Sequence, residues 1–237
     1  MIRYAGYILI SVLVITVCSG TLPASGQSAA LFYGESNSEP SSYMQLLNGR
    51  IWHNRYAKAQ GDPYYLSDEF LKGSVTFNGV KYSDLDLRFD ICNDELILRT
   101  ENRPIIIMNK EMVDSFSLYF EGRIYRIINS GNDPSGILKG YVNVLYAGRS
   151  ELYAKYTKII YPLGADGRYD LFHQAHSLFF VTESGAMPVK GKRALLKLLE
   201  AERKEINAYL RNNRVRITWK DPYSFIPVVK HFDNAGR

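Results

Sequence analysis

Residues 88–99 read RFDICNDELILR and gather the residue types of this chain that could do chemistry: two aspartates, a glutamate and a cysteine. Converging carboxylates could bind a divalent cation, which for calcium requires oxygen ligands within about 2.3–2.6 Å. Alternate residues of one strand diverge instead, and the sequence lacks the Asp-x-Asp-x-Asp-Gly calcium loop. Acidic neighbours also disfavour the thiolate form of Cys92. We therefore expect no metal ligand and no catalytic residue here, only a turn between two strands.

The polar residues of this segment are interpreted as one side of a β-hairpin. Apolar and polar residues alternate from 84 to 91, as in a strand with one buried face. A two-residue turn at 93–94 would pair Phe89 with Leu98 on the buried face. Asp90 would then lie on the solvated face, where replacement by Asn is expected to change stability by at most about 0.5 kcal/mol.

Tyrosines are the second group of candidates, and the chain has 18 of them. Tyr64, Tyr65, Tyr153 and Tyr156 could form an exposed surface that binds a partner protein or a glycan, because a tyrosine combines an apolar ring with a polar tip. Strands also favour tyrosine for packing, so the same residues could be buried. The sequence leaves both interpretations open.

An enzyme is the competing functional class. Carboxylates such as Asp62, Asp68 and Glu69 could supply the acid/base pair of an envelope-glycan hydrolase, since such pairs have no fixed sequence spacing. The sequence contains no nucleophile elbow, phosphate-binding glycine loop, zinc-binding His-Glu-x-x-His or dinucleotide fingerprint. His173 and His176 would point to opposite faces of a strand. We expect no cofactor and favour a protein without catalytic activity.

The elements that must position these residues are strands joined by tight turns. Asn-Gly at 78–79 and Glu-Gly at 121–122 predict two-residue hairpin turns, and Ala-Gly at 147–148 separates two tyrosine-rich strands. The inward positions change from even to odd numbers near 83–84, which predicts a β-bulge there. With strands from about 71 to 181, the expected fold class is α+β: an antiparallel β meander, built as a sheet, a sandwich or a partly rolled barrel.

The hydrophobic period changes to that of a helix at Lys192. A long amphipathic C-terminal helix is expected over 192–213, with Glu202 near the middle of its apolar stripe, where we expect a structural partner. The opposite face is basic and is either solvated or in contact with an anionic surface. A short strand at 214–219 and a short terminal helix, with Pro227 in its first turn, complete the expected fold.

The first 26 residues have the pattern of a secretory signal peptide: a charged start, an apolar run and small residues before the cleavage site. We expect cleavage after Gly26, an N-terminal linker over 27–42 and a single domain over 43–237. The mature chain would be exported to the periplasm, the cell surface or the medium, with Cys92 as its one cysteine. A lipid anchor on Cys18 is the alternative.

The charge balance is mildly basic. The chain carries 29 Lys and Arg against 24 Asp and Glu, a net charge of +5, and removal of residues 1–26 takes away one base and leaves +4. An excess of this size does not predict nucleic-acid binding, whereas peripheral contact with a membrane stays open.

Three segments carry a resemblance to known proteins: GSVTFNGVKYSDLDLRFDICNDELIL, ELYAKYTKII and LLKLLEAERKEINAYL. Together they resemble a recurring type of exported bacterial β-rich protein to which no activity is assigned. The resemblance implies an address in the cell envelope and supplies no catalytic residues. We therefore expect a non-catalytic binding or assembly module for an envelope protein or a surface polymer. The sequence does not predict an oligomeric state.

Overall fold

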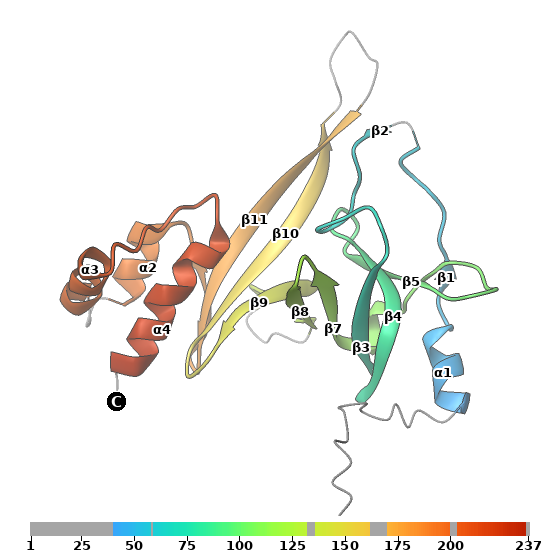
Figure 1. Ribbon diagram of the computed structural model, residues 1–237, viewed down its shortest axis with the longest axis horizontal. Coiled ribbons are helices and arrows are strands. Elements are labelled where there is room, and N and C mark those ends of the chain that lie inside the picture. Colours follow the sequence, from blue (N-terminus) through green and yellow to red (C-terminus); the bar gives the residue numbers. More distant parts are fainter. Residues whose placement is uncertain (1–39, 58, 132–135, 162–169, 200–202, 236–237) are drawn as a thin grey trace, which may run out of the picture. The chain divides into compact units, whose positions relative to one another are not determined.

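The structure, a computed structural model, describes residues 40–57, 59–131, 136–161, 170–199 and 203–235. This part of the chain is mostly β, with one large sheet and a few short helices (Figure 1). The strand order is β1-β6-β5-β4-β3-β7-β8-β9-β10-β11-β12, and β2 adds a parallel pairing to β11. The described sheet is therefore open and mixed, not purely antiparallel as predicted. The predicted signal peptide and most of the predicted linker lie outside the described residues.

The strands vary in length from two to thirteen residues. Their bounds are β1 Arg50–Ile51, β2 Ala59–Gln60, β3 Leu71–Phe77, β4 Val80–Asp90, β5 Glu95–Arg99, β6 Ile106–Ile107, β7 Val113–Phe120, β8 Arg123–Asn129, β9 Tyr141–Ala147, β10 Glu151–Tyr161, β11 Asp170–Thr182 and β12 Gly185–Val189. The helices are α1 Pro40–Leu46, α2 Lys192–Leu198, α3 Arg203–Asn212 and α4 Ile226–Ala235, with 3-10 turns η1 Lys110–Met112 and η3 Pro222–Phe225. In the described ranges, none of the helices has the length and apolar character that crossing a membrane requires.

Two predicted hairpins form with the expected register. β3 pairs with β4 so that Phe77 lies opposite Val80, and β7 pairs with β8 so that Phe116 lies opposite Ile127. The first turn places residues 78 and 79 in the left-handed region, with φ of 49° and 76°. Asn and Gly tolerate this region better than other residues, which is why the pair closes a two-residue turn.

The predicted bulge is also confirmed. Between the pairs 73–85 and 75–82, two residues of β4, Ser83 and Asp84, face the single residue Ser74 of β3. Asp84 has a φ of 56°. The extra residue changes the inward positions of β4 from even to odd numbers and so keeps the apolar side chains of both halves on one face.

The predicted two-residue turn between β4 and β5 is wrong. Phe89 lies opposite Leu96, two positions from the predicted partner, and the turn holds the four residues 91–94. The Asp90 side chain sets this geometry, because its Oδ1 accepts hydrogen bonds from the backbone N of residues 92 and 93 at 2.8 and 2.9 Å. A shift by two residues keeps the apolar face, so hydrophobic alternation does not distinguish the two registers.

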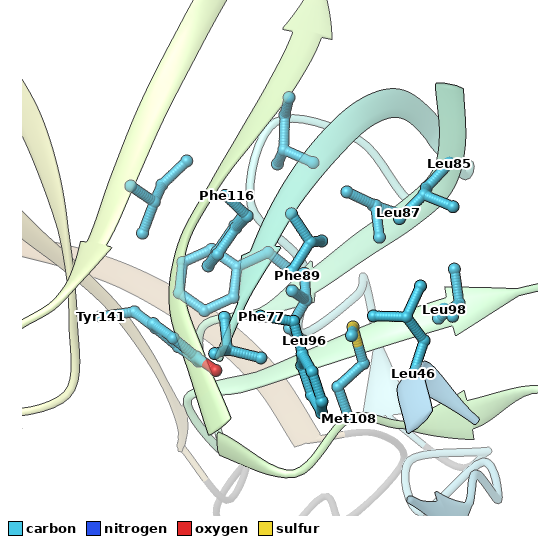
Figure 2. Packing of buried hydrophobic residues seen from close by; sticks show 14 of the residues in the cluster. Leu46, Phe77, Leu85, Leu87, Phe89, Leu96, Leu98, Met108, Phe116 and Tyr141 are labelled. Atoms are coloured by element: carbon cyan, nitrogen blue, oxygen red, sulfur yellow. The ribbon is translucent and has the colours of Figure 1, made fainter. Parts of the chain in front are cut away.

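Inward apolar residues of the sheet form the larger core cluster, part of which Figure 2 shows. The ring of Phe89 contacts Phe116 and Tyr141 edge to face, with centroids 5.2 and 5.5 Å away. Leu46 of α1 is fully buried against this cluster. Edge-to-face pairs of this kind contribute about 0.5–1.5 kcal/mol each beyond the burial of their area.

A second core cluster joins the C-terminal helices to the other end of the sheet, where α4 contacts β9 and β10, and α2 contacts β12. The three helices lie together beside β9–β11 in Figure 1. The buried members of this second cluster are Leu152, Ala154, Leu178, Phe180, Val189, Leu195, Leu196, Leu199, Ile206, Leu210, Phe225, Val228 and Val229.

The single long helix predicted over 192–213 is not formed. Helix α2 ends at Leu198, and Leu199 leaves the helical conformation with φ −100° and ψ 36°. A straight helix of that length would extend about 33 Å, whereas two shorter helices can both cover the same cluster. Glu202 lies outside the described residues. The strand predicted at 214–219 is reduced to one isolated bridge, while the terminal helix is confirmed, with Pro227 as its second residue.

Candidate functional site

The structure buries most of the tyrosines that the sequence offered as an exposed surface. Tyr64, Tyr65 and Tyr153 are 8%, 5% and 7% exposed, and Tyr156 is half-buried. Tyr153 and Tyr156 are three positions apart on β10, so they project from opposite faces of the strand. The four residues therefore do not form one exposed patch.

Tyr65 and Tyr156 belong instead to a packed cluster with Tyr125 and Tyr223. The ring centroid of Tyr65 lies 4.8 Å from that of Tyr156 and 6.0 Å from that of Tyr125. Asn143 Nδ2 donates a hydrogen bond to the Tyr65 hydroxyl at 2.7 Å. Burial is the main cause that raises the pKa of Tyr65, Tyr156 and Tyr223. These phenols therefore stay protonated and serve packing.

Tyr64 has a different structural role, because its ring stacks on a guanidinium group. The Cζ atom of Arg88 lies 4.0 Å from the ring centroid of Tyr64, 4.3 Å from that of Phe70 and 5.0 Å from that of Trp52. Cation–π contacts stabilise such an arrangement by roughly 0.5–2 kcal/mol each. The aromatic rings thus cover a charged position of β4 that the sequence pattern assigned to solvent.

The carboxylates considered for a hydrolase do not come together in a hollow. Asp62 Oδ1 accepts hydrogen bonds from Lys158 Nζ at 2.9 Å and from the backbone N of Tyr64 at 2.7 Å. These contacts fix the chain segment that holds the tyrosines to β10. Asp68 and Glu69 are exposed.

The two close histidines are separated, as expected for opposite faces of β11. His176 packs on Trp219 with ring centroids 4.7 Å apart, and His173 contacts Tyr161 at 5.7 Å. Burial lowers the pKa of His176. Throughout the described part of the chain, no group of three or more His, Cys, Asp or Glu residues is placed to hold a metal ion.

Asp90 is buried, at 3% exposure, so its predicted place on the solvated face is wrong. Besides the two backbone N–H groups of its turn, its carboxylate accepts a bond from Asn93 Nδ2 at 2.8 Å. Burial is the main cause that raises the pKa of Asp90. The neighbouring Cys92 Sγ accepts from the Tyr56 hydroxyl at 3.5 Å, and burial raises the pKa of Tyr56 to about 12. This group of side chains holds the turn closed.

The other acids of the turn are paired with bases. Asp94 Oδ2 accepts from Lys110 Nζ at 2.5 Å and from Lys155 Nζ at 3.1 Å. Glu95 Oε1 accepts from Arg50 at 2.7 Å. Because Asp94 joins β10 to the turn between β4 and β5, the acidic segment works as a structural junction.

The face of the sheet opposite the Phe89 core carries a hollow of about 510 Å³, which we call the sheet groove. Strand alternation creates it: where Val75 and Phe116 point into the core, their neighbours point to the other side. The residues that line the sheet groove are Ser74, Thr76, Lys81, Ser115, Phe116, Ser117, Ile124, Arg126, Ile127, Ile128, Val144, Ala147, Glu151 and Tyr153.

Short hydroxyl side chains form the floor of the sheet groove. Ser74 pairs with Ser117 and Thr76 with Ser115 across β3 and β7. The hydroxyl oxygens of Ser74 and Ser117 are 2.9 Å apart and share a hydrogen bond. At the far side Tyr153 donates to Glu151, so one of the predicted tyrosines does line this hollow. The floor therefore offers hydroxyl donors and acceptors to a ligand.

The rim of the sheet groove combines positive charge with exposed apolar surface. Lys81 and Arg126 are exposed. Ile124 is 67% exposed, and its cross-strand partner Tyr119 is 55% exposed. Adjacent strands thus carry bases that can form ion pairs, hydroxyls that can form hydrogen bonds, and an apolar pair that can contact the ring of a ligand.

Sequence reasoning did not identify the sheet groove. The predicted turn at 121–122 implies that Ser115 and Ser117 lie on the outer face of their strand, and the registers of the hairpins at 78–79 and 121–122 are correct. The missing fact was that β3 lies beside β7, a pairing between hairpins that no turn residue encodes.

Comparison of the whole chain with protein-family models, curated proteins and solved structures gave no match in any of the three.

Proposed function

We propose that this protein is an exported, non-catalytic binding module whose sheet groove holds a surface polysaccharide that carries carboxylate groups. The observation that carries the proposal is the hydroxyl floor of the groove with two exposed bases on the neighbouring strands. Its volume of about 510 Å³ lies within the range of roughly 300–1,000 Å³ that is usual for ligand sites.

The chemistry of the groove favours a sugar polymer. Hydroxyls of Ser74, Thr76 and Ser115 can exchange hydrogen bonds with sugar hydroxyls, and Ile124 and Tyr119 can contact the apolar face of a sugar ring. Arg126 and Lys81 are complementary to carboxylate groups, for which a guanidinium offers two parallel N–H donors.

A protein strand fits this place less well. β3 lies between β4 and β7, and β7 lies between β3 and β8, so their backbone groups are already paired. A peptide that adds to a sheet does so at an exposed edge through backbone hydrogen bonds. Recognition on this face must therefore come from side chains, which suits a ligand rich in hydroxyls.

The test is affinity electrophoresis of the mature chain in gels that contain an acidic polymer, such as polygalacturonate or alginate, or neutral dextran. We expect retardation by an acidic polymer. The double variant Lys81→Gln/Arg126→Gln should lose at least about tenfold in affinity, because each base contributes a charge-assisted hydrogen bond.

The matched control removes two exposed positive charges elsewhere, in Arg103→Gln/Lys139→Gln. This control should bind within about twofold of the original chain. Equal losses in both double variants, or the absence of retardation by any acidic polymer, would contradict the proposal. If the protein releases new reducing ends from a polymer and Asp62→Asn abolishes this release, the hydrolase hypothesis would replace the proposal of a binding module.

Export is part of the same proposal and has its own test. Amino-terminal sequencing of the protein from its native source should begin at Gln27 or within a few residues of it. A retained Met1, or an acylated Cys18 at the start, would show an anchored protein instead.

A further inference from the structure

The positive charge of this chain is concentrated at its C-terminal end. Residues 190–237 hold 12 of the 29 Lys and Arg but 5 of the 24 Asp and Glu, a net +7. The preceding 189 residues hold 17 bases and 19 acids, a net −2. The mild overall charge therefore hides a strongly basic helical region beside a nearly neutral sheet.

Part of this charge converges on one hollow of about 720 Å³, which we call the basic hollow. Lys204, Asn207 and Arg211 lie at spacings of three and four on one face of α3, and Lys192 begins α2. The complete lining is Lys192, Lys204, Asn207, Leu210, Arg211 and Val215. In the part of the chain that the structure describes, no acid lines the hollow.

The bases of the basic hollow differ from several lysines of the sheet region in their ion pairs. Lys110, Lys155 and Lys158 are each bonded to an aspartate of the sheet region. Among the described residues, Lys204 and Arg211 form no ion pair. Glu200 and Glu202 count in the charge above and lie outside the described residues. An anion inside the hollow would be attracted by each of the bases that line it.

One wall of the hollow is apolar. Leu210 is 5% exposed and Val215 is half-buried, so part of the lining excludes water. An anion that enters is partly desolvated, which strengthens its attraction to nearby cations. The Asn207 amide can donate a hydrogen bond to the same ligand.

We propose that the basic hollow binds a phosphate group. A phosphate presents several acceptor oxygens and negative charge in a compact volume, which three convergent cations and one amide can surround. The group can belong to the headgroup of an anionic lipid or to a soluble phosphate compound. This site shares no residue with the sheet groove, and its ligand is a phosphate group and not a sugar polymer, so either proposal can fail without the other.

The experiment measures binding of the mature chain to vesicles of phosphatidylcholine, with or without phosphatidylglycerol, at about 0.1 M salt, where surface charges act over about 10 Å. Cosedimentation should require phosphatidylglycerol. The variant Lys204→Gln/Arg211→Gln should lose roughly 25-fold, because each base near an anionic surface contributes about fivefold.

A second arm titrates inorganic phosphate and pyrophosphate while the melting temperature is followed. A rise that Lys204→Gln/Arg211→Gln abolishes would identify a soluble phosphate as the ligand, since a ligand of the native state stabilises it by mass action. Vesicle binding that phosphate does not displace would identify the lipid. Both results support the site.

The control Arg103→Gln/Lys139→Gln loses the same charge from other parts of the chain and should bind within about twofold of the original protein. Equal losses in the two double variants would show diffuse attraction and overturn the proposal. It is also overturned if neither vesicles nor phosphate bind. Lys81→Gln/Arg126→Gln should leave binding at the basic hollow unchanged, which keeps the test independent of the glycan proposal.

Discussion

Replacement of Asp233 is the sharpest test of how the C-terminal helices are joined to the sheet. Asp233 lies on α4 and is 8% exposed. Its carboxylate accepts hydrogen bonds from the backbone N of Ser150 at 3.1 Å, from the Ser150 hydroxyl at 2.6 Å and from the Tyr146 hydroxyl at 3.0 Å. One side chain thus caps the turn between β9 and β10.

The expected cost follows from these three bonds. Asp233→Ala removes all of them and leaves the N–H of Ser150, a residue that is 3% exposed, without an acceptor. Bonds to a charged group contribute about 1.5–3 kcal/mol, and the loss of a buried charge offsets part of this, so we expect about 2–4 kcal/mol. Asp233→Asn keeps an acceptor for the backbone and should cost about 1 kcal/mol or less. The adjacent Asn234 is exposed, and Asn234→Ala should stay within about 0.5 kcal/mol.

Gly148 supplies an independent measure of the same contact. A Cβ atom at this position would overlap both Asp233 Oδ2 and the Tyr146 hydroxyl oxygen. Gly148→Ala should therefore cost about 1–3 kcal/mol, as overpacking does. In the double variant with Asp233→Ala, one of the two overlaps disappears. The loss of unfolding free energy in the double variant should therefore be smaller, by at least about 1 kcal/mol, than the sum of the losses in the two single variants.

Urea unfolding followed by fluorescence of Trp52 and Trp219 measures these free energies, provided the slope with urea stays constant across the variants. A cost below about 0.5 kcal/mol for Asp233→Ala would refute the reasoning. Strict additivity of Gly148→Ala and Asp233→Ala would refute it as well, because it would show that the two side chains do not meet.

Three further changes test the sheet. Phe89→Ala should cost about 3–5 kcal/mol in urea unfolding, because it leaves a cavity between two other rings. Asp90→Ala should cost about 2–3 kcal/mol, because it removes the hydrogen-bond acceptor of two backbone N–H groups in the buried turn. A cost as small as that of a surface substitution would contradict the burial of Asp90. Because burial lowers the pKa of His176, the unfolded chain takes up its proton more readily than the folded one, and stability falls as the pH drops below about 6.5. His176→Phe should flatten the unfolding free energy between about pH 7 and pH 5, and an unchanged slope would argue against the burial of this ring.

Local turn chemistry explains what the sequence predicted well. Hairpins at 78–79 and 121–122 have registers that depend on two adjacent residues with positive φ, and the bulge at 83–84 follows from a change of parity within one strand. A turn after β4 was predicted, but its length and register were wrong because they depend on the Asp90 side chain, which accepts hydrogen bonds from two backbone N–H groups that follow it. Asp can close a turn in this way or point to solvent, and the residue type is the same in both cases.

Coverage by distant segments explains why the polar side of β4 is not solvated near the end of the strand. The polar side of β4 looks solvated because Arg88 alternates with aspartates. In the structure, Trp52, Tyr64 and Phe70 approach this side from an earlier part of the chain and stack on the guanidinium. Arg can be covered by aromatic rings while it remains charged, so a strand with regular alternation is buried on both faces near its end. Nothing in the period of the strand itself signals that cover.

The residue types on the outer face of β3 and β7 support the proposal that the sheet groove binds a ligand. Central strands favour β-branched and aromatic residues, which fill the surface between neighbours. On the outer face of β3 and β7 the paired positions hold Ser74 with Ser117 and Thr76 with Ser115, and all four residues line the hollow. Serine gains little from packing there, so the three serines depart from what stability alone favours, whereas Thr76 is a residue that strands favour. Departures of this kind are expected at functional surfaces, and this is the physical reason for proposing this face as the polymer-binding site.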